Sequence, residues 1–245
     1  MPAITSAILV VGNEILSGTT QDANIAFIAK RLALRGIQLS EVRIVRDDEA
    51  QIIETVNALR EKYRYVFSTG GIGPTHDDIT SECMAKAFGV AHEVNAEAKR
   101  RLEEYYNPRG IELNEARRRM AMIPKGALLI ENPVSVAPGF NIGNVFVMAG
   151  VPKIMQGMFD HVDTLIEGGN PVESRTLRSN LKEGDIAAEL GAIQKDFPEV
   201  DIGSYPHMAQ TPSLSLTLRS ADVARLDAAA AKVAALIRAH GEEPQ

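Results

Sequence analysis

The sequence predicts an α/β fold with a mostly parallel sheet, followed by a small α+β segment. Predicted strands at residues 7–11, 37–45 and 65–68 alternate with amphipathic stretches long enough for helical crossovers between parallel strands. The linker-like sequence Gly168-Gly169-Asn170-Pro171 then precedes a β-α-β-β-α pattern. We therefore expect two domains, residues 1–170 and 171–245.

Composition excludes several classes of protein. The 245 residues are 45% hydrophobic and 24% charged, which is ordinary for a soluble globular protein. The net charge of −6 argues against a nucleic-acid partner, and a single cysteine, Cys83, excludes an intrachain disulfide and a cysteine zinc cluster. The N-terminus lacks the basic start of a signal peptide, and no apolar run approaches ~18 residues. We expect a cytoplasmic protein without a membrane segment.

The first predicted strand, residues 7–11, is a continuous apolar run that ends at Gly12. In a doubly wound sheet, the loops that leave the carboxyl ends of strands face the ligand crevice. Glu14, Ser17 and Asn24 follow this strand and are therefore candidate ligand-binding residues. A polar surface loop and a helix cap explain the same residues equally well.

A helix that Asp22 can cap comes next, and Gly36 ends it before the second strand at residues 37–45. Asp47 and Asp48 then begin another helix. An acid pair at a helix start usually interacts with the helix dipole. Because this pair also lies at the carboxyl end of a strand, a catalytic or metal-binding role is a second possibility.

Three glycines within four positions follow the third strand, in the sequence Thr69-Gly70-Gly71-Ile72-Gly73-Pro74-Thr75. Glycines allow a ligand to approach the backbone closely, and the free N–H groups of such a turn bind anions together with the start of the next helix, near Thr80. Asp77 and Asp78 lie beside this cradle, so a bound phosphate would require a divalent cation between it and the acids. The alternative is an ordinary glycine turn followed by a helix with acidic caps.

Two common phosphate motifs do not fit this turn. A P-loop requires a lysine after the glycines, and none is present. The dinucleotide fingerprint requires a third glycine where this chain has His76. The five histidines show no metal-ligand spacing and receive no role: His76, His92, His161, His207 and His240.

Charged and proline-containing segments follow the cradle. Helical stretches at 95–106 and 114–122 carry Arg100-Arg101 and Arg117-Arg118-Arg119 and form the basic part of an acidic chain. A solvated helical pair explains these arginines, although one or two of them can reach over the cradle toward a phosphate. A hairpin with strands at 140–142 and 145–148 is predicted to turn at Gly143-Asn144, and a helix to begin at Pro152. The last segment has strands at 174–178, 202–206 and 213–218 and two helices, without the G-x-x-G of a nucleic-acid clamp.

Four motifs together resemble one known family. They are Gly12-Asn13-Glu14-Ile15-Leu16, the cradle with Asp77-Asp78-Ile79-Thr80, Asn132-Pro133 with Ala137-Pro138-Gly139-Phe140, and Gly150-Val151-Pro152. They resemble the MoaB/Mog-like molybdopterin-binding domain, in the form found at the N-terminus of CinA proteins. The resemblance implies a three-layer, mostly parallel sheet, followed by a small KH-like α+β domain. The C-terminal amidase domain of many CinA proteins is expected to be absent.

The resemblance implies three alternative functions. One is metal-dependent cleavage of a nucleotide pyrophosphate such as ADP-ribose, another is binding or adenylylation of molybdopterin, and the third is a non-enzymatic nucleotide-binding module. It also implies Mg²⁺ or a similar cation, K⁺ as a further candidate, a phosphate-bearing small molecule as ligand and assembly into a homo-oligomer. The aspartates of the Mog-type site correspond to Asp78 and to one of Asp47 and Asp48.

The candidate site residues are gathered from the motifs and their positions. The catalytic candidates are Asp78, Asp77, Asp48 and Asp47, and the metal-binding candidates are Asp78, Asp77 and Glu14. The candidates for binding phosphate or ligand are Gly70, Gly71, Ile72, Gly73, Thr75, Asn13, Glu14, Ser17, Asn24, Asn132, Pro138, Gly139 and Gly150. The chain departs from the family pattern at Ser135, Ala149 and Ile154, where members commonly have glycine, proline and an acid.

Overall fold

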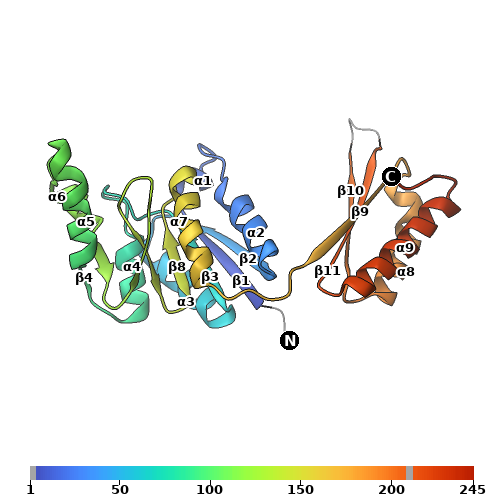
Figure 1. Ribbon diagram of the computed structural model, residues 1–245, viewed down its shortest axis with the longest axis horizontal. Helices are drawn as coiled ribbons and strands as arrows, with labels where there is room; N and C mark the ends of the chain where they lie inside the picture. Colours follow the sequence, from blue (N-terminus) through green and yellow to red (C-terminus); the bar gives the residue numbers. More distant parts are fainter. Residues whose placement is uncertain (1–3, 208–211) are drawn as a thin grey trace. The chain divides into compact units, whose positions relative to one another are not determined.

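The computed structural model describes residues 4–207 and 212–245. These residues form two compact units, Met1–Gly169 and Asn170–Gln245. The first unit contains two hydrophobic cores, and the second unit contains one. Figure 1 follows the chain through both units.

The first unit is built on a six-stranded sheet with the order β2-β1-β3-β8-β7-β6. Strands β2, β1, β3 and β8 are parallel, whereas β7 and β6 are antiparallel to their neighbours. The bounds are Ile4–Val11 for β1, Ile37–Val45 for β2, Tyr65–Thr69 for β3, Leu128–Ile130 for β6, Gly139–Ile142 for β7 and Val145–Met148 for β8. The expected mostly parallel sheet is confirmed, and the carboxyl ends of its four parallel strands meet at one edge.

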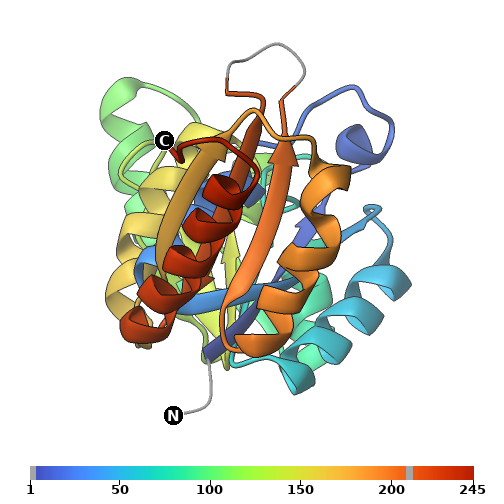
Figure 2. The same cartoon turned by 90° about the vertical axis from the view of Figure 1, so that its right-hand side faces the viewer.

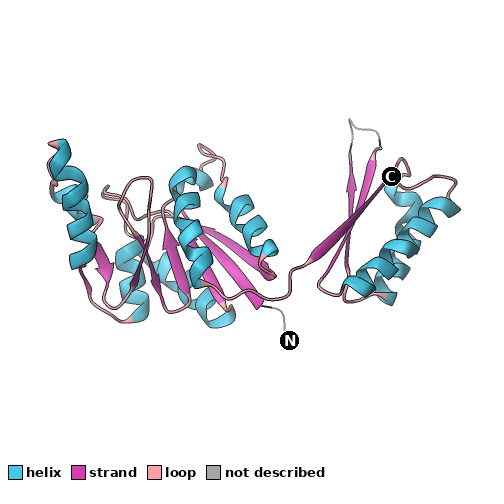
Figure 3. Ribbon diagram, in the orientation of Figure 1, coloured by secondary structure: helices cyan, strands magenta, loops and turns pink. Residues whose placement is uncertain are grey.

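Helices cover both faces of this sheet (Figures 1 and 3). On one face, α2 (Asn24–Leu34) and α7 (Pro152–Leu165) bury residues such as Leu32 and Phe159 against Phe67. On the other face, α3 (Glu49–Lys62) and α4 (Thr80–Phe88) bury Val56 and Met84. Burial of one apolar stripe on each helix is the main force that holds the three layers together.

An excursion between α4 and β6 differs from the expectation. It contains α5 (Ala96–Tyr106), the short 3₁₀ helix Asn107–Arg109, α6 (Glu115–Arg119) and a two-stranded ribbon of β4 (His92–Val94) and β5 (Met122–Pro124). The predicted continuation of the second helix to residue 122 is wrong, because Met122 pairs with Val94 in the ribbon. The loop after β1 likewise contains a helical turn, α1 (Asn13–Leu16), that the sequence did not indicate.

The second unit has the expected β-α-β-β-α order. Strands β9 (Glu173–Ser179), β10 (Asp201–Pro206) and β11 (Leu214–Ser220) form an antiparallel sheet with the order β10-β11-β9. Helices α8 (Glu183–Asp196) and α9 (Val223–Ala239) pack on one face of it, over alternate leucines of β11 (Figure 2). Across residues 4–207 and 212–245, no helix combines the length and apolar character needed to span a bilayer.

Candidate functional site

A cavity of about 560 Å³ lies at the carboxyl edge of the parallel strands. Its walls come from the loops that follow β1, β2, β3 and β8, together with the segment that precedes β7. The cavity therefore lies where the topology of a parallel α/β sheet places a ligand. Of the predicted site residues, ten line it: Glu14, Asp47, Gly70, Gly71, Ile72, Gly73, Asp77, Asp78, Asn132 and Gly150.

At each of the three cradle glycines, a different neighbouring atom leaves no room for a side chain. Gly70 has a φ of +99°, and a Cβ there would lie 2.1 Å from the carbonyl oxygen of Val11. Gly71 has a φ of +68°, and its Cβ would lie 2.0 Å from the Thr80 hydroxyl oxygen. At Gly73, a Cβ would lie 2.6 Å from Oδ2 of Asp78. Only glycine fits these positions without displacement of a neighbour, so the backbone itself forms the floor of the site.

The cradle has backbone donors available for an anion. The carbonyl of Gly71 accepts from the Thr80 N–H at 2.9 Å, which joins the turn to the start of α4. Within the described residues, the N–H groups of Gly71, Ile72 and Gly73 donate no intramolecular hydrogen bond. Free donors beside a helix N-terminus form an electropositive patch that suits a phosphate oxygen.

Four carboxylates line the same cavity as these donors: Glu14, Asp47, Asp77 and Asp78. Asp78 Oδ2 accepts hydrogen bonds from the backbone N–H of Thr75 at 2.8 Å and from the Thr75 hydroxyl. Asp47 Oδ2 accepts from the backbone N–H of Asn13 at 3.0 Å. These bonds fix one oxygen of Asp78 and one of Asp47 and leave the second oxygen of each for other partners.

Hydrogen bonding lowers the pKa of Asp77, first from Thr75 and then from its own backbone N–H, and the positive charge of Arg119 adds to this. In the described geometry the Thr75 hydroxyl donates its one proton to Asp78. Asp77 is therefore anionic at neutral pH.

The structure separates the acid pair after β2. Asp47 lines the cavity. Asp48 is the N-cap of α3, where its carboxylate accepts from the N–H of Gln51 at 3.0 Å, and it is absent from the cavity lining. Thus Asp47 is the member of the pair that faces the site.

Several other predicted residues support the cavity from outside its lining. Asn24 is 3% exposed and donates to the carbonyl of Gly150 at 2.7 Å, which fixes the turn after β8. The Ser17 hydroxyl bonds within its own loop, to the carbonyl of Glu14. Gly139 is needed for strand packing, because a Cβ there would lie 2.4 Å from the carbonyl oxygen of Val147. Thr75 and Asn13 act through their hydrogen bonds to Asp78 and Asp47.

The wall formed by residues 132–137 is held by a buried amide. Asn132 is 7% exposed; its Nδ2 donates to the Ser135 hydroxyl and the Ala137 carbonyl, both at 2.7 Å. Its Oδ1 accepts from the backbone N–H groups of Val134 and Ser135. Within this loop Val136 has a φ of +65°, a left-handed conformation that is costly for a β-branched residue. The four hydrogen bonds of the Asn132 amide hold the loop in one conformation and so stabilise the left-handed backbone at Val136.

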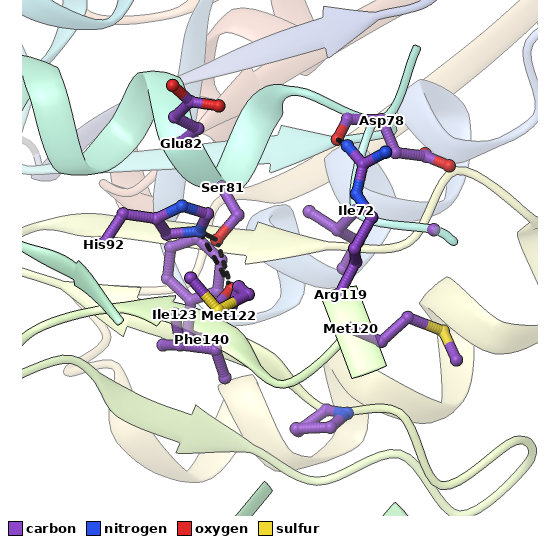
Figure 4. Close-up of a pocket in the computed structure, with 12 residues that line it drawn as sticks. Ile72, Asp78, Ser81, Glu82, His92, Arg119, Met120, Met122, Ile123 and Phe140 are labelled. Atoms are coloured by element: carbon purple, nitrogen blue, oxygen red, sulfur yellow. Dashed lines mark hydrogen bonds between the residues drawn. The ribbon is translucent and has the colours of Figure 1, made fainter. Parts of the chain in front are cut away.

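A second cavity of about 310 Å³ adjoins the first (Figure 4). The two share Ile72, Gly73, Asp78 and Met120 as lining residues. Pro138, a predicted ligand-binding residue, lines this second cavity. Arg119 also lines it and lies at the cradle, with Nη2 3.4 Å from the carbonyl oxygen of Asp78, so one arginine of the basic segment does reach the site.

The residues that sequence reasoning missed are mainly apolar or belong to the excursion. In the first cavity they include Met158, and in the second they include Ser81, His92 and Met122. No local motif identifies these residues, because their place in the site depends on the ribbon of β4 and β5 and on the packing of α7.

The carboxylates suit a hard divalent cation, which prefers oxygen ligands. Among the described residues, no group of three or more His, Cys, Asp or Glu side chains is close enough to hold a metal ion unaided. The donor set instead fits the mode common for Mg²⁺, in which one or two carboxylates bind the ion together with ligand phosphates and water. Asp78 and Asp47 each keep one oxygen free for this, and Asp77 and Glu14 also line the cavity.

The fold agrees with comparisons to known proteins. Residues 7–166 match the family described as a probable molybdopterin binding domain, and residues 171–244 match the family described as the FAD synthase middle domain. The chain belongs to the molybdopterin-binding domain family, and the predicted MoaB/Mog-like resemblance is confirmed. The second unit matches the FAD synthase middle domain and not an amidase, and the expected small α+β region is confirmed.

Within that family the chain is similar to CinA. The crystal structure of CinA from Thermoplasma acidophilum, described as having unknown function, is 35% identical with a TM-score of 0.62; the match covers 66% of this chain and 97% of that one. A protein of Pyrobaculum arsenaticum is 38% identical over 208 residues, 81% of this chain and 78% of the relative. One of Archaeoglobus fulgidus is 35% identical over 199 residues, 81% of this chain and 84% of the relative.

Proposed function

We propose that this protein is a metal-dependent hydrolase of a nucleotide pyrophosphate bond, with ADP-ribose as the first substrate to test. The observation that carries the proposal is the charge pattern of the larger cavity. Free backbone N–H groups lie beside four carboxylates, and no lysine or arginine lines this cavity in the described part of the chain. A phosphate bound at the cradle would be repelled by these acids unless a cation accompanied it.

The roles of the residues follow from their positions. The N–H groups of Gly71, Ile72 and Gly73 bind oxygens of one phosphate and orient the pyrophosphate over the cradle. Asp78, with Asp77 or Asp47, would hold a Mg²⁺-like ion, and Glu14 would be a further ligand or the base that takes a proton from the attacking water. When bound, such an ion polarises a phosphoryl oxygen and lowers the pKa of a coordinated water.

The match of the second unit to the FAD synthase middle domain adds FAD to the candidate substrates. FAD and ADP-ribose both carry an adenosine joined through a pyrophosphate, so one phosphate cradle serves both. Mg²⁺, Mn²⁺ and Co²⁺ are the cations to compare, each with and without K⁺.

Molybdopterin is the second candidate ligand, because the family matched by residues 7–166 is described as a probable molybdopterin binding domain. Its phosphate would occupy the same cradle. Binding of molybdopterin by a protein that cleaves no dinucleotide would favour this function.

The deciding experiment is a chromatographic assay of ADP-ribose and FAD cleavage by the purified protein, across the cation panel. We expect metal-dependent turnover that Asp78→Asn abolishes. Asp47→Asn and Asp48→Asn form a matched pair: the first should lose activity, and the second should retain it, since asparagine caps a helix as well as aspartate does. Absence of turnover by the folded protein in every cation would refute the hydrolase proposal, and retained nucleotide binding would then indicate a non-enzymatic module.

A further inference from the structure

The second cavity has the chemistry of a binding site for a flat ring. Its apolar residues include two methionines and an aromatic ring, and they are Ile72, Met120, Met122, Ile123, Pro138 and Phe140. Methionines adapt their shape and make favourable contacts with aromatic rings. The polar residues are Ser81, Glu82, His92 and Arg119. Figure 4 shows His92 and Ser81 beside Met122, and Arg119 near Ile72. A volume of about 310 Å³ is at the lower end of the range for small-molecule sites.

The cradle lies on the boundary between the two cavities. Gly73 and Asp78 line both, so a ligand whose phosphates bind at the cradle can extend into the second cavity. Arg119 lines the second cavity and contacts the carbonyl of Asp78 at this boundary. A nucleotide fits this division, because it has a charged phosphate end and an uncharged heteroaromatic end.

The hydrogen bonds of His92 fix its tautomer. Nε2 lies 3.1 Å from the carbonyl oxygen of Met122 and 3.1 Å from the hydroxyl of Ser81, which itself donates to the same carbonyl at 2.8 Å. A carbonyl only accepts, so Nε2 of His92 carries the proton. In the neutral ring Nδ1 is then an acceptor, and among the described residues it has no hydrogen-bond partner.

We propose that this cavity binds the heteroaromatic base of the ligand and that His92 determines its specificity, by accepting a hydrogen bond from an exocyclic amino group such as that of adenine. The inference rests on the proposed function in one respect, namely that phosphates occupy the cradle. Hypoxanthine differs from adenine in carrying an oxo group in place of this amino group. An oxo acceptor would face the acceptor Nδ1, so the site selects adenine over hypoxanthine.

The test compares the affinities of inorganic pyrophosphate, ADP and IDP by isothermal titration calorimetry with Mg²⁺. Pyrophosphate reports on the cradle alone, ADP adds the nucleoside, and IDP changes only the base. We expect ADP to bind more tightly than pyrophosphate and about 10-fold more tightly than IDP, which is the effect of one lost hydrogen bond and one repulsive contact.

Three variants complete the test. His92→Ala should equalise the ADP and IDP affinities and leave that of pyrophosphate unchanged. Ser81→Met, which fills the cavity from α4, should remove the advantage of ADP over pyrophosphate. Glu93→Gln, an exposed neighbour of His92 outside both cavities, is the control and should match the wild type.

Two outcomes would overturn the inference. The first is that pyrophosphate binds but ADP and IDP bind equally well, or that His92→Ala and Ser81→Met both leave the preference for ADP intact. The base would then not occupy this cavity, although phosphate binding at the cradle would remain supported. If no ligand binds, pyrophosphate included, the proposed function fails together with the inference.

Discussion

Substitution of Gly71 by alanine tests the geometry on which the cradle depends. The φ of +68° places this residue in the left-handed region, which costs an alanine about 1–2 kcal/mol. The new Cβ would also lie 2.0 Å from the hydroxyl oxygen of Thr80, a fully buried side chain. Relief of such overpacking typically costs about 1–3 kcal/mol. We therefore expect Gly71→Ala to reduce the free energy of unfolding by about 2–5 kcal/mol and to weaken pyrophosphate binding.

Gly89 provides the matched control, because its φ of +65° is nearly the same and a Cβ there would meet nothing within 4 Å. Gly89→Ala should show the conformational cost of about 1–2 kcal/mol alone. Thr80→Ala removes the clashing hydroxyl, which has no hydrogen-bond partner among the described residues, so the double variant Gly71→Ala/Thr80→Ala should recover most of the difference. Urea unfolding measured by circular dichroism gives all four values. Equal losses in Gly71→Ala and Gly89→Ala, or strict additivity with Thr80→Ala, would refute the close approach of Gly71 to Thr80.

Three further predictions concern residues outside the cavities. Asp48→Ala removes the cap of α3 and should lower the free energy of unfolding in urea by about 1 kcal/mol. Pyrophosphate binding measured by calorimetry should be unchanged, and weakened binding would show that Asp48 belongs to the site. Hydrogen bonding, first from Tyr63, lowers the pKa of Glu41 from 4.5 to about 2. The stability that Glu41 contributes is therefore complete above about pH 4.5 and is lost as the pH falls toward 2. Tyr63→Phe should raise this pKa in an NMR titration, and an unchanged value would contradict the assignment. Burial raises the pKa of Cys83 to about 12. A thiol reagent at pH 8 should therefore label Cys83 only when α4 opens or the protein unfolds. Rapid labelling of the native protein would contradict this, because it would show that the side chain is accessible.

The parts of the fold that local patterns specify were predictable from the sequence. Residues 37–45 form the predicted strand, Gly143 turns the predicted hairpin with a φ of +57°, and Pro152 begins α7. The cradle was predictable for the same reason, because glycine spacing is a local signal. The ribbon of β4 and β5 was missed because its two three-residue strands are far apart in the sequence and stabilise each other only by pairing.

The choice between Asp47 and Asp48 shows a limit of sequence reasoning about sites. Both residues follow the same strand, and both are suitable as a helix cap or as a ligand-binding acid. Their roles diverge because the backbone N–H of Asn13 bonds Asp47, while the N–H of Gln51 bonds Asp48. The first donor comes from a loop 34 residues earlier, so only the folded arrangement assigns the roles. His92 escaped prediction for a similar reason, since its tautomer is set by contacts with α4 and β5.

The departures from the family pattern indicate how the larger cavity divides its chemistry. Where the resemblance implies an acid two residues after Pro152, this chain has Ile154, and Ile154 lines the cavity together with Ala149. The turn after β8 and helix α7 therefore contribute an apolar wall, and the four carboxylates all come from the loops after β1, β2 and β3. Under the proposed function, a cation would therefore lie on the side of the cavity nearest the cradle, and the wall at α7 would face an uncharged part of the ligand. If this division holds, Ile154→Asp should draw the cation toward α7 and lower the rate of pyrophosphate cleavage, whereas Ile154→Leu should leave the rate unchanged.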